Sequence, residues 1–194
     1  MQLKATLIRP LLIFGITGII LFSIIVFFPN SYLVSTAYIL SFFQQARPGL
    51  PVHLKIPKIN VDADIEYVGL TSKGAVDVPK TVTKAGWFNQ GPRPGEKGSA
   101  VIVGHFGLKN FVTAVFSYLY KLKKGDKIYV KDDKGATAVF TVRESRNYDP
   151  KADATYVFST NDGKSHLNLI TCEGAWNNIT KTYSQRLVVF ADEE

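Results

Sequence analysis

From Val52 onward the sequence alternates between apolar and polar residues, and this period of two is the feature that most constrains the fold. Two stretches, 52–56 and 61–67, show the alternation without a break. Side chains of a β-strand point in turn to its two faces, so each stretch predicts a strand with one buried face and one solvated face. The chain beyond residue 51 is therefore expected to be mainly β-sheet.

The rest of this region adds further predicted strands and one predicted helix. The predicted strands occupy 75–78, 100–105, 127–131, 136–146, 166–172 and 183–191. Residues 110–122 carry apolar side chains three or four positions apart, which predicts a helix. Residues 147–164 form a longer irregular stretch. Eight or so short strands with one helix are typical of a β-barrel or a β-sandwich.

The first 51 residues differ in kind, because they contain only three charged residues, Lys4, Arg9 and Arg47, all basic. Residues 11–28 carry no charge, and as a helix they would span roughly 27 Å, close to the thickness of a bilayer's hydrocarbon core. Because Lys4 and Arg9 precede this run, the N-terminus is expected on the cytoplasmic side. The alternative is a cleaved signal peptide with a small-residue site at 35–37, although the apolar run is longer than such peptides usually have.

These observations predict a single-pass type II protein of the cell membrane with four parts. Residues 1–10 are the cytoplasmic N-terminus, 11–28 a transmembrane signal-anchor helix, and 29–51 a juxtamembrane segment and linker. Within that third part, 32–43 remain apolar and 44–51 contain two prolines and a glycine, which break regular structure. Residues 52–194 are then the extracellular domain.

Charge and cysteine content exclude several classes of protein. The chain has 23 basic and 16 acidic residues, so removing the three basic residues of the first 51 leaves 20 − 16 = +4 for the domain. No dense stripe of Lys and Arg interleaved with aromatic residues is present, so nucleic-acid binding is not indicated. The single cysteine cannot form an intramolecular disulfide. Acidic residues scattered in loops do not predict a metal site, and no cofactor is predicted.

That single cysteine, Cys172, ends the predicted strand 166–172 on its more polar face. A free cysteine is often a small buried hydrophobic residue, and this reading stands beside that of a nucleophile. A catalytic thiol needs a proton partner. His166 lies six residues earlier on the same strand, roughly 20 Å away, and is excluded as that partner. His53 is expected at the surface.

Two further residues complete a possible site. His105 ends an apolar strand and lies between Gly104 and Gly107, which allow backbone or ligand to approach closely. Arg186 lies in the last strand among residues that are apolar on both faces, so its guanidinium must reach a groove or a partner. The structural alternatives are a packed histidine and an arginine that extends to solvent.

Three segments resemble, in this order, the His, Cys and Arg motifs of the sortase family: 103–105 (Val-Gly-His), 169–172 (Leu-Ile-Thr-Cys) and Arg186. Asn168 stands where the family's Thr-Leu-x-Thr-Cys pattern begins with Thr. The similarity runs from about residue 56 to 191, and 85–88 with 91–96 resemble the stretch before the histidine in class E and class F sortases. The resemblance implies an all-β, eight-stranded sortase-type β-barrel with one or two short helices. This barrel would be the catalytic domain at 52–194, and it would follow the N-terminal transmembrane helix.

The resemblance also implies a function, that of a membrane-anchored cysteine transpeptidase that cleaves a sorting signal of the Leu-Pro-x-Thr-Gly type. Cys172 would attack the Thr carbonyl carbon and form a thioacyl intermediate, His105 would protonate the leaving Gly amine, and Arg186 would stabilise the oxyanion or hold the substrate. Thr171 would support the oxyanion or bind substrate, and 147–164 corresponds to the family's signal-choosing loop. The implied partners are surface proteins with a C-terminal sorting signal, and an amine nucleophile from a cell-wall precursor or a pilin lysine. Water would be a slower acceptor.

Two alternatives to this function remain open. The first is a catalytically inactive, membrane-anchored binding domain. The second is a different Cys/His peptidase, but an L,D-transpeptidase would require a pattern resembling Ser-His-Gly-Cys, and a papain-like enzyme places Cys before His. Neither arrangement is present.

Overall fold

The computed structural model describes residues 47–109 and 111–194. The predicted cytoplasmic N-terminus, the predicted anchor at 11–28 and most of the predicted linker lie outside these residues. Within the described residues, no helix has the length and apolar character needed to cross a membrane.

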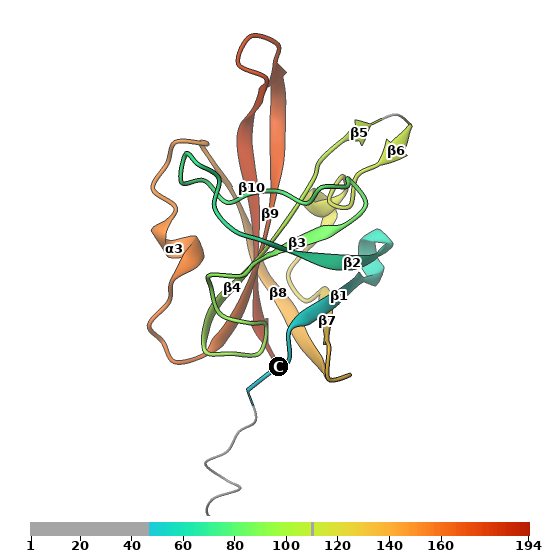
Figure 1. The fold of residues 1–194 in the computed structure, drawn as a ribbon, viewed down its shortest axis with the longest axis vertical. Helices are drawn as coiled ribbons and strands as arrows, with labels where there is room; N and C mark the ends of the chain where they lie inside the picture. The colour runs from blue at the N-terminus through green and yellow to red at the C-terminus, as the bar shows by residue number, and fades with distance from the viewer. Residues whose placement is uncertain (1–46, 110) are drawn as a thin grey trace, which may run out of the picture. The chain divides into compact units, whose positions relative to one another are not determined.

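Eight strands close into a barrel, in the order β1-β2-β3-β4-β9-β10-β8-β7 (Figure 1). The two remaining strands, β5 and β6, form a separate small hairpin. The predicted eight-stranded β-barrel is therefore confirmed. The strands are β1 (Pro51–Ile56), β2 (Val61–Val68), β3 (Ala85–Phe88), β4 (Gly98–Gly104), β5 (Leu108–Lys109), β6 (Val112–Thr113), β7 (Lys127–Asp132), β8 (Thr137–Tyr148), β9 (Ser165–Asn177) and β10 (Thr182–Glu193).

In residues 47–109 and 111–194, three short helical turns connect the strands. Two are 3₁₀ turns, η1 (Pro57–Ile59) and η2 (Leu119–Lys121), and the third is the single α-helical turn α3 (Thr155–Phe158). The turn α3 belongs to the connection between β8 and β9, residues 149–164, which we call the cover segment. In Figure 1 it lies to one side of the barrel.

The barrel interior is filled by the inward-facing side chains of the strands. Leu54 of β1, Leu167 and Leu169 of β9 and Val189 of β10 are fully buried there. Burying apolar side chains of this size contributes roughly 1.5–3 kcal/mol each, so the alternating strands supply most of the stabilisation of the fold.

The outer face of three adjacent strands is also covered. Val157 of α3 packs against Val188 and Phe190 of β10, and Phe158 packs with the cluster that contains Val103 of β4 and Ile170 of β9. This second layer explains why 100–105 is apolar on both faces, since a strand covered on both sides needs no polar face.

The predicted helix over 110–122 is wrong. This stretch contains strand β6 and the short turn η2, and Phe111 is 97% exposed with a φ of 63°. The backbone N–H groups of Ala114 and Val115 donate to the carbonyls of Gly107 and Val82, across the chain and not along a helix. The helical spacing arises because Phe116, Leu119 and Leu122 are buried from a compact turn.

Two further predictions need correction. Strand β9 does not end at Cys172 but continues to Asn177, paired with β10 across a bulge near Gly174. Gly174 has a φ of 84°, and a Cβ there would lie 2.3 Å from the Ser184 hydroxyl, so glycine allows the pairing to continue. The predicted strand at 75–78 is only an isolated bridge between Leu70 and Val76.

Candidate active site

Strand β9, which carries Cys172, lies between β10, which carries Arg186, and β4, which ends one residue before His105. On one side, Cys172 lies directly opposite Arg186 of β10. On the other side, β4 runs parallel to β9 with Val103 opposite Ile170. His105 lies two residues after Val103, and Cys172 lies two residues after Ile170. His105, just past the end of β4, is therefore level with Cys172. The topology thus brings together three residues that are far apart in sequence.

The backbone around His105 is fixed by several contacts. Its Nε2 lies 2.9 Å from the carbonyl oxygen of Pro79, and because a carbonyl only accepts, this nitrogen carries a proton. Its own carbonyl accepts the N–H of Phe116 at 3.0 Å. A Cβ on the preceding residue, Gly104, would come within 2.4 Å of the Phe116 ring, so only glycine permits this packing. The imidazole is therefore held in one place as the chain leaves β4.

Thr171 is buried and faces away from Cys172, because neighbouring residues of a strand point to opposite faces. Its hydroxyl donates to the carbonyl of Gly104 at 2.8 Å. This bond ties β9 to β4 one residue before His105. The role in substrate binding that the resemblance implies for Thr171 stays a prediction, while the geometry gives its hydroxyl a position next to the histidine.

The thiol of Cys172 is half-buried and has no disulfide partner. Burial raises the pKa of the Cys172 thiol, and the positive charge of Arg186 partly opposes that rise. Near neutral pH the free site therefore holds mainly the neutral thiol, and a nucleophilic thiolate requires removal of its proton.

Arg186 is held by the backbone of its own strand. Its Nη1 donates to the carbonyls of Gln185, at 2.9 Å, and Tyr183, at 3.3 Å. A guanidinium has five N–H donors, so this anchoring leaves others to meet a carbonyl or an oxyanion beside Cys172.

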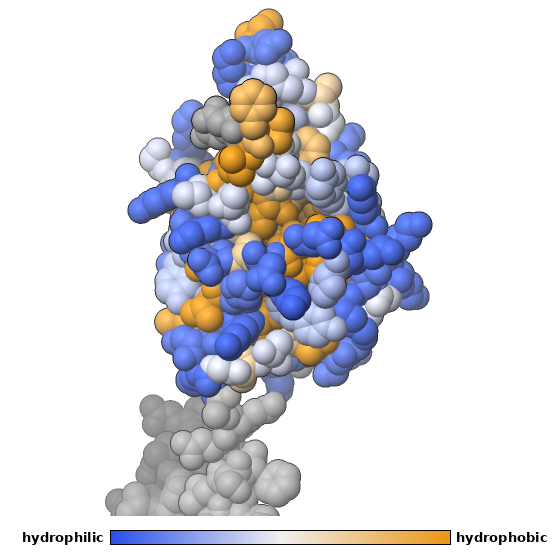
Figure 2. Space-filling view, turned by 90° about the vertical axis from the view of Figure 1, so that its right-hand side faces the viewer, coloured by the Kyte–Doolittle hydropathy of each residue, from blue (hydrophilic) through white to orange (hydrophobic). Residues whose placement is uncertain are grey.

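An aromatic cluster beside the site was not predicted from sequence. Phe106, which follows His105, packs edge-on against Tyr183 with ring centroids 5.4 Å apart, and Tyr183 packs against Trp176 at 5.0 Å. The three residues come from two distant segments, so no local pattern joins them. Apolar side chains also gather at the tips of the β5–β6 and β9–β10 hairpins, where Figure 2 shows orange surface; they include Leu108, Phe111, Trp176 and Ile179.

The other two histidines lie away from Cys172. His53 of β1 is partly exposed, and its Nε2 lies 2.6 Å from a carboxylate oxygen of Asp62. His166 is buried near the start of β9 and contacts Asp162 and Asp192. In the described residues, no group of three His, Cys, Asp or Glu side chains is placed to hold a metal ion.

Comparisons with known proteins agree with this geometry. The family model of the sortase domain matches residues 54–194. No curated protein matches the chain. Sortase C-1 from Actinomyces oris is a similar solved structure, with 27% sequence identity and a TM-score of 0.59 over 78% of this chain and 77% of that chain.

Two other solved structures are similar over much of the chain. Sortase A from Corynebacterium diphtheriae is 25% identical, with a TM-score of 0.59, over 80% of this chain and 67% of that chain. Sortase C2 of Group B Streptococcus pilus island 1 is 29% identical, with a TM-score of 0.57, over 74% and 73%. The matches therefore include sortases of more than one class.

Proposed function

Because this chain belongs to the sortase family, we propose that it is a cysteine transpeptidase that cleaves a sorting signal of the Leu-Pro-x-Thr-Gly type and transfers the acyl group to an amine. One observation carries the proposal. Cys172 lies on β9, directly opposite Arg186 of β10 and level with the end of β4, where His105 emerges.

In the first half of the proposed reaction, the Cys172 sulfur attacks the Thr carbonyl carbon of the signal. Burial favours the neutral thiol, so its proton must leave first, and in the proposed step it passes to Nδ1 of His105, which leaves a thiolate beside an imidazolium. Negative charge develops on the carbonyl oxygen, and the free N–H groups of Arg186 stabilise it. His105 then donates a proton to the Gly nitrogen, the peptide C–N bond breaks, and the acyl group remains on sulfur as a thioester.

In the second half, an amine nucleophile attacks the thioester carbonyl. His105, now without the proton it gave away, accepts a proton from the attacking amine, and the Cys172 sulfur leaves as a thiolate. The product is a new amide bond, and the enzyme returns to its starting state when the His105 proton passes back to the Cys172 sulfur. Water can replace the amine, which gives slower hydrolysis. The amine is expected to come from a cell-wall precursor or from a pilin lysine.

The proposal includes attachment to the cell membrane in type II orientation. It rests on the uncharged run at 11–28 and on the basic residues that precede it. The domain beyond residue 51 would then meet its substrates on the outer surface. Protease treatment of intact protoplasts tests this, because an external domain is digested, while full protection of the domain would contradict the orientation.

The activity is tested with a quenched fluorescent peptide that contains the sorting signal, with and without an added amine. We expect peptide cleavage, a thioacyl adduct on Cys172 detected by mass spectrometry, and a transfer product when the amine is present. Labelling by a thiol-reactive substrate analogue separates an active enzyme from an inactive binding domain. An absence of both adduct and cleavage for a panel of such signals would contradict the proposal. The resemblance to classes E and F stays a prediction.

A further inference from the structure

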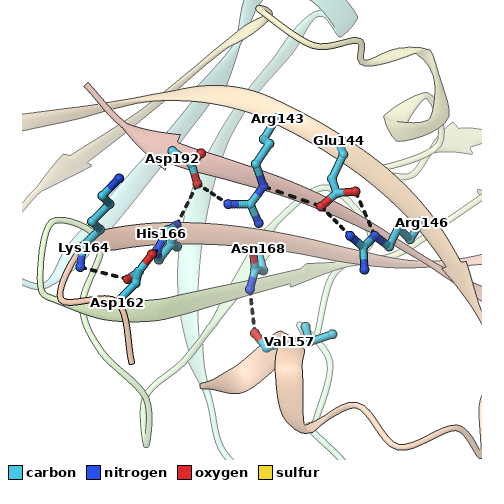
Figure 3. Close-up of polar contacts among 9 residues, drawn as sticks. All are labelled: Arg143, Glu144, Arg146, Val157, Asp162, Lys164, His166, Asn168 and Asp192. Carbon is cyan, nitrogen blue, oxygen red and sulfur yellow. Dashed lines mark hydrogen bonds and ion pairs between the residues drawn. The ribbon is translucent and has the colours of Figure 1, made fainter. Parts of the chain in front are cut away.

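His166 is a buried histidine that the proposed reaction does not use. Only 5% of its side chain is exposed, and each ring nitrogen contacts a carboxylate (Figure 3). Its Nδ1 lies 2.7 Å from Asp192 of β10, and its Nε2 lies 2.9 Å from Asp162 of the cover segment.

This geometry specifies the charge of the ring. An ionised carboxylate only accepts hydrogen bonds, so two such partners at these distances require an N–H on both nitrogens. Only the imidazolium has both. Ser99, opposite His166 on β4, is neutral, and its buried hydroxyl has no partner among the described residues. The ring is thus a cation that bridges two anions.

The two carboxylates differ in how firmly they are held. Asp192 is paired with His166 across the β9–β10 ladder and is also bound by Arg143 at 2.8 Å. Asp162 lies in the cover segment, outside any strand, and its side chain is 48% exposed. The N–H of Lys164 and the His166 ring hold the pKa of Asp162 below its usual value. If the bridge is broken, the contact with Asp162 is therefore the one that is free to open.

The cover segment is fastened to the barrel by one other polar contact from β9. Nδ2 of buried Asn168 donates to the carbonyl of Val157 at 2.6 Å (Figure 3). Asn168, Ile170 and Cys172 share one face of β9, and Phe158 packs with the cluster that includes Ile170. Cys172 is two residues farther along the same face, roughly 7 Å away. A peptide that reaches the thiol along this face must pass the edge of the cover segment.

We propose that His166 is a positioning residue for the substrate: as an imidazolium bridging Asp192 and Asp162, it fixes the cover segment that borders the approach to Cys172. This inference rests on the proposed function, because the substrate in question is the sorting-signal peptide. Loss of this bridge loosens the segment and weakens peptide binding, while the reacting groups around Cys172 stay in place.

The charged groups around His166 identify the useful variants. Asp162 faces it from the cover segment, Asp192 from β10, and Arg143, itself bound to Glu144, from β8. Lys164 contacts Asp162 through its backbone N–H. Asp162→Asn keeps the side-chain shape and removes the charge at an exposed position, so the fold is retained. His166→Gln removes the cation at the buried position.

The test measures KM and kcat of the full chain in detergent, with a fluorogenic sorting-signal peptide, at one fixed pH. We expect the KM of His166→Gln to lie about tenfold above that of the wild type, the change expected for one hydrogen bond to a charged group. Asp162→Asn should raise KM in the same direction. His53→Gln is the matched control, because His53 also contacts two carboxylates, Asp62 and Asp64, but lies on β1.

A second readout needs no turnover. Hydrogen exchange of the amides of residues 155–164 should speed up in Asp162→Asn and His166→Gln without substrate. If exchange behaves so but no peptide is cleaved, the proposed function fails, while the role of His166 in fixing the cover segment stands. An unchanged KM and exchange in both variants, an equal effect of His53→Gln, or a loss confined to kcat would overturn the proposal.

Discussion

The hydroxyl of Thr171 offers the sharpest test of how the site is built. It donates a 2.8 Å hydrogen bond to the carbonyl of Gly104, in a position that is 3% exposed. Thr171→Val keeps the shape and removes the donor. Removing one partner of a buried hydrogen bond costs about 1–3 kcal/mol, so the free energy of unfolding should fall by that amount.

The effect on activity follows from what the bond fixes. Gly104 immediately precedes His105, and the Thr171 hydroxyl joins β9 to β4 here, one residue beyond the last strand pair, Val103 with Ile170. A displacement of about 1 Å in a catalytic group can cost roughly 10²-fold, so we expect kcat to fall between about 10-fold and 100-fold. KM should change little, since Thr171 faces away from Cys172 and from the approach of the peptide.

The assay combines urea unfolding, followed by circular dichroism, with kcat and KM on the sorting-signal peptide. Thr171→Ser is the control, because it keeps the hydroxyl and removes only a methyl group, at a cost of about 0.8 kcal/mol. It should retain most of kcat. A Thr171→Val protein with normal stability and normal kcat but a raised KM would refute this reasoning and favour the direct contact with substrate that the family resemblance implies.

Three further predictions concern the same site. Cys172→Ala should abolish cleavage and transfer, and His105→Ala should lower kcat/KM by about 10²- to 10⁴-fold, the range for a positioned acid or base, whereas His53→Ala should leave it unchanged. Arg186 lowers the pKa of the Cys172 thiol against the effect of burial, so Arg186→Gln should raise that pKa further and slow alkylation by iodoacetamide at neutral pH; an unchanged alkylation profile would show that the charge does not act on the thiol. Gly104→Ala should destabilise the domain and lower kcat together, because its Cβ meets the Phe116 ring at 2.4 Å, and wild-type melting and turnover would contradict the packing argument.

Much of the barrel is predictable because its strands obey a local rule. In an antiparallel or mixed sheet with one solvated face, every second residue of a strand faces the core and is apolar, as 52–56 and 61–67 show. The helix predicted over 110–122 failed for the converse reason. Spacing of three or four also arises when a compact turn buries residues such as Phe116 and Leu119, and hydrogen bonds to Gly107 and Val82 replace those of a helix.

The site was predictable only in part. His105, Cys172 and Arg186 occur in this order along the sequence and are matched by a family pattern, but the register that places them side by side is a long-range property. His166 illustrates the limit. The sequence excludes it as a partner for the thiol but does not indicate its actual partners, because Asp162 and Asp192 belong to the cover segment and to the last strand.

The two faces of β9 carry residues with different roles in the site. Its inner face carries Leu167, Leu169 and Thr171, which fill the barrel and fix the chain beside His105. Its outer face carries His166, Asn168 and Cys172, of which the first two hold the cover segment and the third is the proposed nucleophile. Because neighbouring residues of a strand cannot exchange faces without a shift in register, the two roles are structurally separate. Substitutions on the inner face of β9 should therefore change stability and kcat. Substitutions on its outer face before Cys172 should change KM.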